Sequence, residues 1–139
     1  MSSARDRFCF VCGSENASSL GVIFQRGVDG QSFTTYRARP EHDGWPGMLH
    51  GGVLFALLDD AVGWAARFSG VPTVTAKAEI RYRRNVPTNA TLLISARISE
   101  RGRLLTAEAE AKCGETGVVY AELRARLFPL DATKGSKTV

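Results

Sequence analysis

The stretch that decides the fold is residues 50–69, which read HGGVLFALLDDAVGWAARFS. From Gly52 to Ser69, apolar side chains recur at the three- and four-residue spacing of an α-helix, and Gly70 and Pro72 end the segment. These side chains are Val53, Leu54, Leu57, Leu58, Ala61, Val62, Ala65 and Phe68. Because the helix is apolar on nearly every side, we expect it to be buried in the protein.

Strand patterns lie on both sides of this helix. Residues 20–26 and 31–39 alternate apolar and polar side chains around a turn at Val28-Asp29-Gly30. Four further alternating segments follow the helix, at residues 74–82, 92–98, 105–112 and 119–127. Each has one apolar and one polar face, which is typical of antiparallel strands with one solvated side. The order predicts an α+β fold in which a curved antiparallel sheet wraps around one long central helix, and a partner chain can cover the sheet edges.

The length indicates a single domain. A chain of 139 residues is long enough to bury one core. We expect an N-terminal cap segment over 1–19, a domain over 20–129, and a disordered tail over 130–139, which has little to bury.

Composition and charge exclude several classes of protein. The net charge of +4 favours an anionic ligand, but the basic residues are scattered and no nucleic-acid-binding module is present. No apolar run reaches the roughly 18 residues of a membrane span, and no apolar signal core follows Met1. Three cysteines are an odd number, which argues against a disulfide framework and favours a cytoplasmic location.

Two adjacent acids lie within the apolar helix. Asp59 and Asp60 are the only charged residues between His50 and Arg67. A buried carboxylate is costly unless it is paired or used, so such acids are candidates for a functional site. The alternative is that one or both reach solvent or an arginine at a subunit contact.

The two acids point about 100° apart on the helix. Asp60 lies near the bulky Val53, Leu57 and Trp64, whereas Asp59 shares a stripe with small residues that leave room for a ligand or equally for close packing against the sheet. Those small residues are Gly52, Ala56, Gly63 and Ala66. We therefore predict that Asp59 is the catalytic carboxylate.

His50-Gly51-Gly52 directly precedes the helix. Free N–H groups in a first helical turn can bind an anion or a polarised carbonyl, and in acyl transfer they act as an oxyanion hole. Gly51 and Asp59 are eight residues apart, about 12 Å along a helix. If both act on one thioester, they must come from different subunits of a two-fold dimer.

The segment from His50 to Asp59, HGGVLFALLD, resembles the signature of the phenylacetyl-CoA-type branch of the hot-dog-fold thioesterases. The resemblance implies a hot-dog fold and an acyl-CoA thioesterase that hydrolyses an acyl- or aryl-acyl-CoA. It implies that the Gly51 N–H polarises the thioester carbonyl and that Asp59 of the facing subunit is base or nucleophile. It also implies a homodimer or a dimer of dimers, with coenzyme A present only as part of the substrate.

One departure from that family pattern concerns the loop before the glycines. Relatives often carry an Asn or Gln there, whereas this chain has His42-Asp43-Gly44-Trp45-Pro46. His42, Asp43 or a backbone group are the candidates to replace the amide. His50 either forms a hydrogen bond in the site or, as we favour, fixes the loop.

Further substrate contacts follow from the same reasoning. We expect His50 and Gly52 at the thioester and apolar acyl contacts from Phe55, Trp64 and Met48. Lys77, Arg81, Arg83 and Arg84 lie on one strand and its end, near where the family holds coenzyme A, although outward basic residues on a strand are commonly only solubilising.

The other interpretations concern metal binding and catalysis. Cys9-Phe10-Val11-Cys12-Gly13 resembles half of a zinc site, but a closed site needs four ligands, and only Cys113, His42 or His50 are available to complete it. We therefore expect no metal and a packed N-terminal cap.

A non-catalytic acyl-CoA-binding or regulatory protein and a hot-dog hydratase or dehydratase are the alternatives to a thioesterase.

Overall fold

The computed structural model describes residues 7–130, so the predicted disordered tail lies, apart from Leu130, outside the described residues. The chain forms β1 (Gln25–Arg26), β2 (Ser32–Arg37), α2 (Gly51–Phe68), β3 (Thr73–Tyr82), β4 (Thr91–Glu100), β5 (Leu105–Cys113) and β6 (Val119–Pro129). Two short 3-10 turns, η1 (Val28–Gly30) and η2 (Pro40–His42), flank β2. The predicted order of two strands, one long helix and four strands is confirmed.

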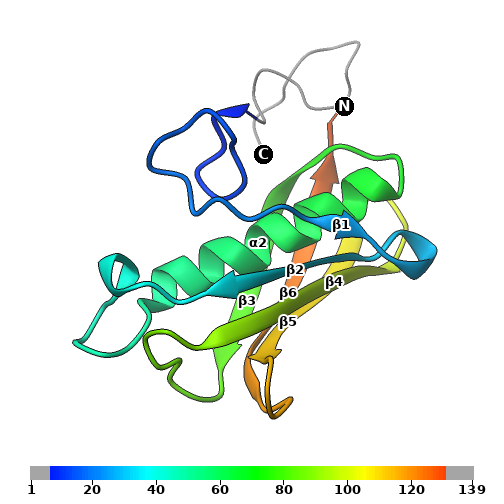
Figure 1. Ribbon diagram of the computed structural model, residues 1–139. Helices are drawn as coiled ribbons and strands as arrows, with labels where there is room; N and C mark the ends of the chain where they lie inside the picture. The colour runs from blue at the N-terminus through cyan, green and yellow to red at the C-terminus, as the bar shows by residue number, and fades with distance from the viewer. Residues whose placement is uncertain (1–6, 131–139) are drawn as a thin grey trace.

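All six strands form one antiparallel sheet in the order β1-β2-β4-β5-β6-β3. Helix α2 lies across one face of this sheet, as Figure 1 shows, and contacts five of the six strands. This is the predicted curved sheet around a central helix, the hot-dog fold.

The core lies between the helix and the concave face of the sheet. Leu57, Leu58 and Val62 of α2 are fully buried, as are Leu92 and Ile94 of β4. The prediction of a buried helix is confirmed for the side facing the sheet. On the rest of the helix only Gly52 and Arg67 are exposed, and Asp60 and Trp64 are half-buried against the N-terminal segment.

The predicted first strand is much shorter than expected. Leu20, Val22 and Phe24 are buried in the predicted alternation, but only residues 25–26 join the sheet. The Leu20 N–H donates to the Phe10 carbonyl and the Val22 N–H to the Val11 carbonyl. The segment therefore pairs with the N-terminal residues, which lie over α2 (Figure 1). Its alternation is correct, and its predicted pairing with residues 31–39 is confirmed for Gln25 and Arg26 but wrong for the residues before them.

A β-bulge interrupts β3. Thr75 pairs with Leu127 and Lys77 with Arg126, which leaves Ala76 as an extra residue. Because side chains alternate along a strand, the extra residue moves Thr75 to the same face as Ala78 and Ile80, toward the helix. The predicted alternation, which put Thr75 on the polar face with Lys77, was therefore wrong before the bulge.

Candidate active site

The carboxylate of Asp59 lies at the middle of α2, against the start of β3. It is half-buried, and the Thr75 hydroxyl donates a hydrogen bond to its Oδ1 at 2.5 Å. The bulge at Ala76 makes this contact possible because it turns Thr75 toward the helix. The hydrogen bond fixes the orientation of the carboxylate and leaves Oδ2 for another partner. Sequence reasoning missed Thr75, since the strand pattern shows no sign of the bulge.

The helix surface around Asp59 is open on one side. Gly52 is exposed, and a Cβ added at Gly63, one turn after Asp59, would meet no atom within 4 Å. Only Ala66, at the far end of the stripe, is fully buried. Gly52 and Gly63 therefore leave space beside Asp59, whereas Ala56 is half-buried and packs against the core.

The start of α2 presents a free backbone donor. His50 is the N-cap, and its Nδ1 accepts a hydrogen bond from the Gly52 N–H at 2.8 Å. Among the described residues, no partner accepts from the Gly51 N–H, which belongs to the unsatisfied first turn. The capping contact holds the His50 side chain at the start of the helix, where it is exposed and not packed.

Tyr82 at the end of β3 fixes the position of Gly51. Its hydroxyl donates to the Gly51 carbonyl at 2.8 Å, and a Cβ on Gly51 would lie 3.4 Å from the Tyr82 ring. Burial raises the pKa of the Tyr82 hydroxyl, so this group remains a neutral donor. Strand β3 thus supports both parts of the candidate site, with Thr75 at Asp59 and Tyr82 at Gly51. Sequence reasoning missed this role of Tyr82.

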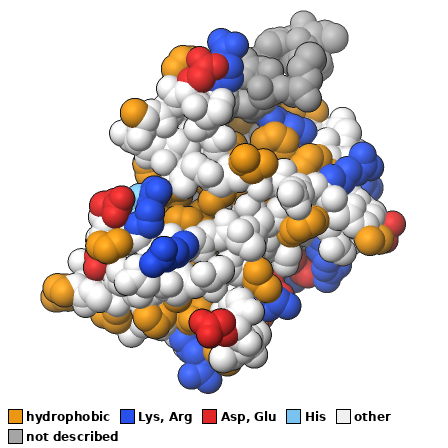
Figure 2. Space-filling view, in the orientation of Figure 1, with side chains coloured by type: hydrophobic (Ala, Val, Ile, Leu, Met, Phe, Trp, Pro, Cys, Tyr) orange, Lys and Arg blue, Asp and Glu red, His pale blue; other side chains and the backbone are white. Residues whose placement is uncertain are grey.

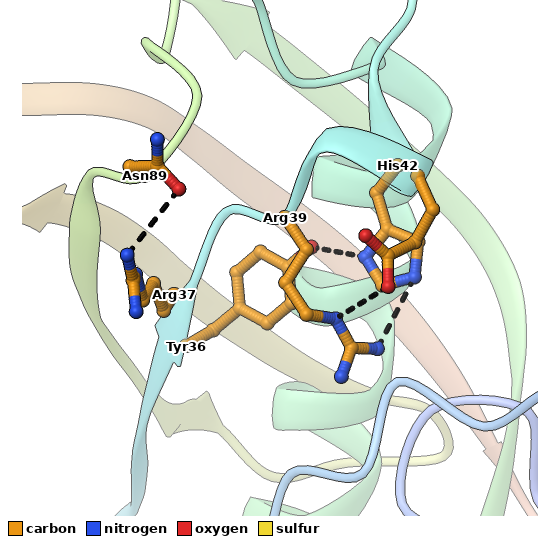
Figure 3. A network of polar contacts seen from close by, with 6 residues as sticks. Tyr36, Arg37, Arg39, His42 and Asn89 are labelled. Atoms are coloured by element: carbon orange, nitrogen blue, oxygen red, sulfur yellow. Dashed lines mark hydrogen bonds and ion pairs between the residues drawn. The ribbon is translucent and has the colours of Figure 1, made fainter.

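The loop before the helix is held by its own polar contacts. The carboxylate of Asp43 accepts from the Gly47 N–H at 3.1 Å and from the Thr88 hydroxyl at 2.7 Å. His42 Nδ1 lies 2.6 Å from the Tyr36 hydroxyl, and its Nε2 lies 3.3 Å from Arg39, as Figure 3 shows. Both side-chain candidates to replace the family amide therefore form hydrogen bonds that hold this loop.

The predicted acyl contacts fall in three places. Met48 is half-buried in the loop, bridged to Pro87, and Phe55 is half-buried on α2. Trp64 lies on another side of the helix, where its indole contacts Phe68, Arg67 and Cys12. The structure does not bring Trp64 to Asp59.

The four basic residues predicted to bind coenzyme A lie at different positions along β3 and just after it. Lys77 and Arg81 pair with β6 residues on the outer face of the sheet, away from α2. Arg83 and Arg84 follow Tyr82 at the end of β3, and Arg83 forms an ion pair with Glu122 at 2.8 Å. Arg81, Arg83 and Arg84 therefore lie at the same end of β3 as Gly51, whereas Lys77 lies near the middle of the strand.

The second acid, Asp60, faces the N-terminal segment. Its Oδ1 lies 3.8 Å from the Cys9 Sγ, and its Oδ2 is buried without a partner among the described residues. Burial raises the pKa of this carboxyl, and the charge of Asp59 raises it further. The two acids thus point to different surroundings, as their 100° separation predicted.

The comparisons with known proteins define the class. Residues 46–120, more than half of the chain, match the thioesterase superfamily. The chain belongs to this superfamily, in agreement with its central helix and its six-stranded sheet.

Three individual proteins are similar to this chain in sequence or in fold. The chain is 27% identical over 116 residues to the acyl-coenzyme A thioesterase THEM4 of Bos taurus, which covers 83% of this chain and 48% of that protein. It therefore spans about half the length of this curated relative. Protein RHA08564, a thioesterase superfamily protein, superimposes with a TM-score of 0.81 and 31% identity, over 88% of this chain and 60% of that one. The E. coli PaaI protein of the phenylacetic acid degradation operon superimposes with a TM-score of 0.76 at 22% identity, over 88% of this chain and 86% of that one.

A thioesterase protein of Streptococcus pneumoniae shares the fold at 21% identity and a TM-score of 0.73, over 84% of this chain and 88% of that one. It has been solved with coenzyme A, and also as variants in which an aspartate at its position 52 or a threonine at its position 68 is alanine. No helix within residues 7–130 of the present chain is long and apolar enough to cross a membrane.

Proposed function

We propose that this protein is an acyl-CoA thioesterase, which hydrolyses an acyl- or aryl-acyl-CoA to the free acid and coenzyme A. The observation that carries the proposal is Asp59, a carboxylate on an open helix surface whose orientation is fixed by Thr75. The named relatives are acyl-coenzyme A thioesterases, and a fold neighbour has been solved with coenzyme A. A cytoplasmic location, inferred from the cysteine count, stays a prediction.

The Asp59 carboxylate and the Gly51 N–H have different roles in the proposed hydrolysis. Asp59, as base or nucleophile, activates a water molecule or attacks the thioester carbon directly. The Gly51 N–H donates to the carbonyl oxygen and stabilises the negative charge that develops there, and the coenzyme A thiolate leaves. The streptococcal variants lend support, because their aspartate and threonine are 16 residues apart, as are Asp59 and Thr75.

The proposed chemistry needs two chains for each site. Asp59 and Gly51 lie about 12 Å apart along one helix, too far to act on one thioester. Strand β3 forms a sheet edge, with β6 as its only partner among the described residues. A two-fold axis through the middle of β3 would set its Thr75 end against the Tyr82 end of the partner's β3. Asp59 would then face Gly51 of the partner subunit.

The test is turnover of a panel of acyl-CoAs, followed by the release of free thiol. Asp59→Asn keeps the size of the side chain and the Thr75 contact, and we expect it to reduce kcat by roughly 100- to 10,000-fold. Asp60→Asn, which changes the neighbouring acid, is the matched control and should retain turnover. A wild-type protein that binds coenzyme A esters without releasing thiol would instead favour the non-catalytic binding protein.

A further inference from the structure

The N-terminal segment and α2 bring together three side chains that metals bind. The Sγ atoms of Cys9 and Cys12 and a carboxylate oxygen of Asp60 all lie within 4.8 Å of one another. Cys9 and Cys12 come from a short turn, and Asp60 comes from the middle of the helix. We propose that these three residues form a binding site for a thiolate-seeking divalent metal ion, most simply Zn²⁺.

The turn around the cysteines has the form of a metal-binding knuckle. The backbone N–H groups of Val11 and Cys12 both point at the Cys9 Sγ, at 3.4 Å. The Gly13 N–H closes the turn on the Cys9 carbonyl at 2.8 Å, and a Cβ at Gly13 would collide with the Cys9 backbone. N–H donors aimed at a sulfur atom stabilise the thiolate form that a metal binds.

The second sulfur has a donor of its own. The Trp64 indole N–H donates to the Cys12 Sγ at 3.4 Å, and the Arg67 guanidinium lies 4.6 Å above the Trp64 ring. Two thiolates and a carboxylate around Zn²⁺ would carry one net negative charge, which the nearby Arg67 offsets. Trp64, expected at the acyl group, is instead placed to orient a metal ligand.

Asp60 is the third ligand, which could not be predicted from the sequence. A four-coordinate zinc site places its ligand atoms about 3.5–3.8 Å apart, and the Cys9 Sγ lies 3.8 Å from Asp60 Oδ1. The buried Oδ2 of Asp60, unpartnered among the described residues, is the group that such an ion satisfies. Cys9, Cys12 and Asp60 supply three ligands, and a water molecule would take the fourth tetrahedral position, so Cys113, His42 and His50 are not needed. The ion would attach the N-terminal segment to α2 and release the thiol protons on binding.

The experiment measures metal content and ligand type on the full chain. After incubation with Zn²⁺ and extensive dialysis, we expect about one zinc per chain by mass spectrometry of the metal. Replacement by Co²⁺ should give the sulfur-to-cobalt charge-transfer absorption of thiolate ligands. The double variant Cys9→Ser, Cys12→Ser should lose both signals, whereas the matched control Cys113→Ser should keep them.

Two milder variants keep the test decisive if the double variant fails to fold. Asp60→Asn retains both thiols, and Trp64→Phe removes only the indole donor; each should weaken zinc affinity by roughly 10- to 100-fold. Folding is checked by circular dichroism on the same samples. Wild-type chain without bound zinc, an Asp60→Asn chain with unchanged affinity, or a Cys9–Cys12 disulfide in freshly purified protein would each overturn the site. These measurements need no thioesterase activity, so they stand apart from the proposed function.

Discussion

At the scale of the residue, the contact between Thr75 and Asp59 is the one most open to direct test. Thr75→Val keeps the shape of the side chain and removes the hydroxyl donor. A hydrogen bond to a charged group contributes about 1.5–3 kcal/mol, so we expect kcat to fall on the order of 10- to 100-fold with little change in KM. Steady-state kinetics on one acyl-CoA checks this. Thr75→Ser, which restores the hydroxyl, should recover most of the rate; a Ser variant as slow as the Val variant would contradict the role.

His42 gives a prediction about pH. Burial lowers the pKa of its imidazole below 6.5, and the positive charge of Arg39 lowers it further (Figure 3). The unfolded chain therefore takes up this proton before the folded chain does as the pH falls. The contribution of neutral His42 is present above about pH 6.5 and is lost as the pH falls toward the folded pKa.

Urea unfolding between pH 7.5 and 5 should accordingly show the free energy of unfolding decreasing more steeply in the wild type than in His42→Gln. Parallel decreases in the two proteins would show that His42 does not contribute to this pH dependence.

At the scale of the element, the start of α2 allows the Gly51 N–H to be removed without breaking the helix. Proline is well tolerated at a first helical position, and His50 before it has φ −63° and ψ 132°, which the residue before a proline favours. Gly51→Pro should reduce kcat by roughly 100-fold or more if the N–H stabilises the oxyanion. Gly51→Ala keeps the N–H and is the matched control. Equal losses in the two variants would indicate that the Tyr82 ring, 3.4 Å from the added Cβ, is the cause.

The elements also show how far the sequence predicts the structure. The helix and five of the six strands follow from apolar periodicity, because α2 and the sheet bury one face each. Asp59 and Gly51 follow from the residue types and their spacing. The contact of Thr75 with Asp59 could not be predicted, because the bulge at Ala76 depends on pairing with β6. The surroundings of Asp60 could not be predicted either, because its neighbours Cys9 and Cys12 are 51 and 48 residues away in the chain. Patterns within a segment are visible in the sequence, whereas contacts between segments are not.

At the scale of the whole molecule, stability depends on the single core between α2 and the sheet. On the face drawn in Figure 2, charged and hydrophobic side chains are interspersed among other residues. Leu58 is fully buried, and Leu58→Ala should lower the free energy of unfolding by about 2–5 kcal/mol. The matched control is Ile23→Ala, at a side chain that is 77% exposed, with an expected change within about 0.5 kcal/mol. Urea denaturation of both variants checks the difference.

The proposed dimer predicts complementation between two inactive chains. A heterodimer of an Asp59→Ala chain and a Gly51→Pro chain has one site in which Asp59 and Gly51 are both intact, and one in which both are altered. Co-expression with two different affinity tags isolates it, and we expect about half of the wild-type dimer's activity. The two homodimers should be inactive. A heterodimer as inactive as they are would show that each site lies within one chain.

The bulge at Ala76 has a consequence for how this chain is compared with others. Side chains along a strand point alternately to the two faces of the sheet. One inserted residue moves every side chain on one side of the insertion to the opposite face. A relative without that residue would keep a threonine in the same alignment column and yet turn it away from its aspartate. Transfer of a catalytic role to or from this protein by aligned position alone is therefore unsafe at Thr75. Because Ala76 follows Thr75, the spacing between the aspartate and the threonine does not reveal the bulge, and the pairing of the strand with its neighbour has to be compared as well.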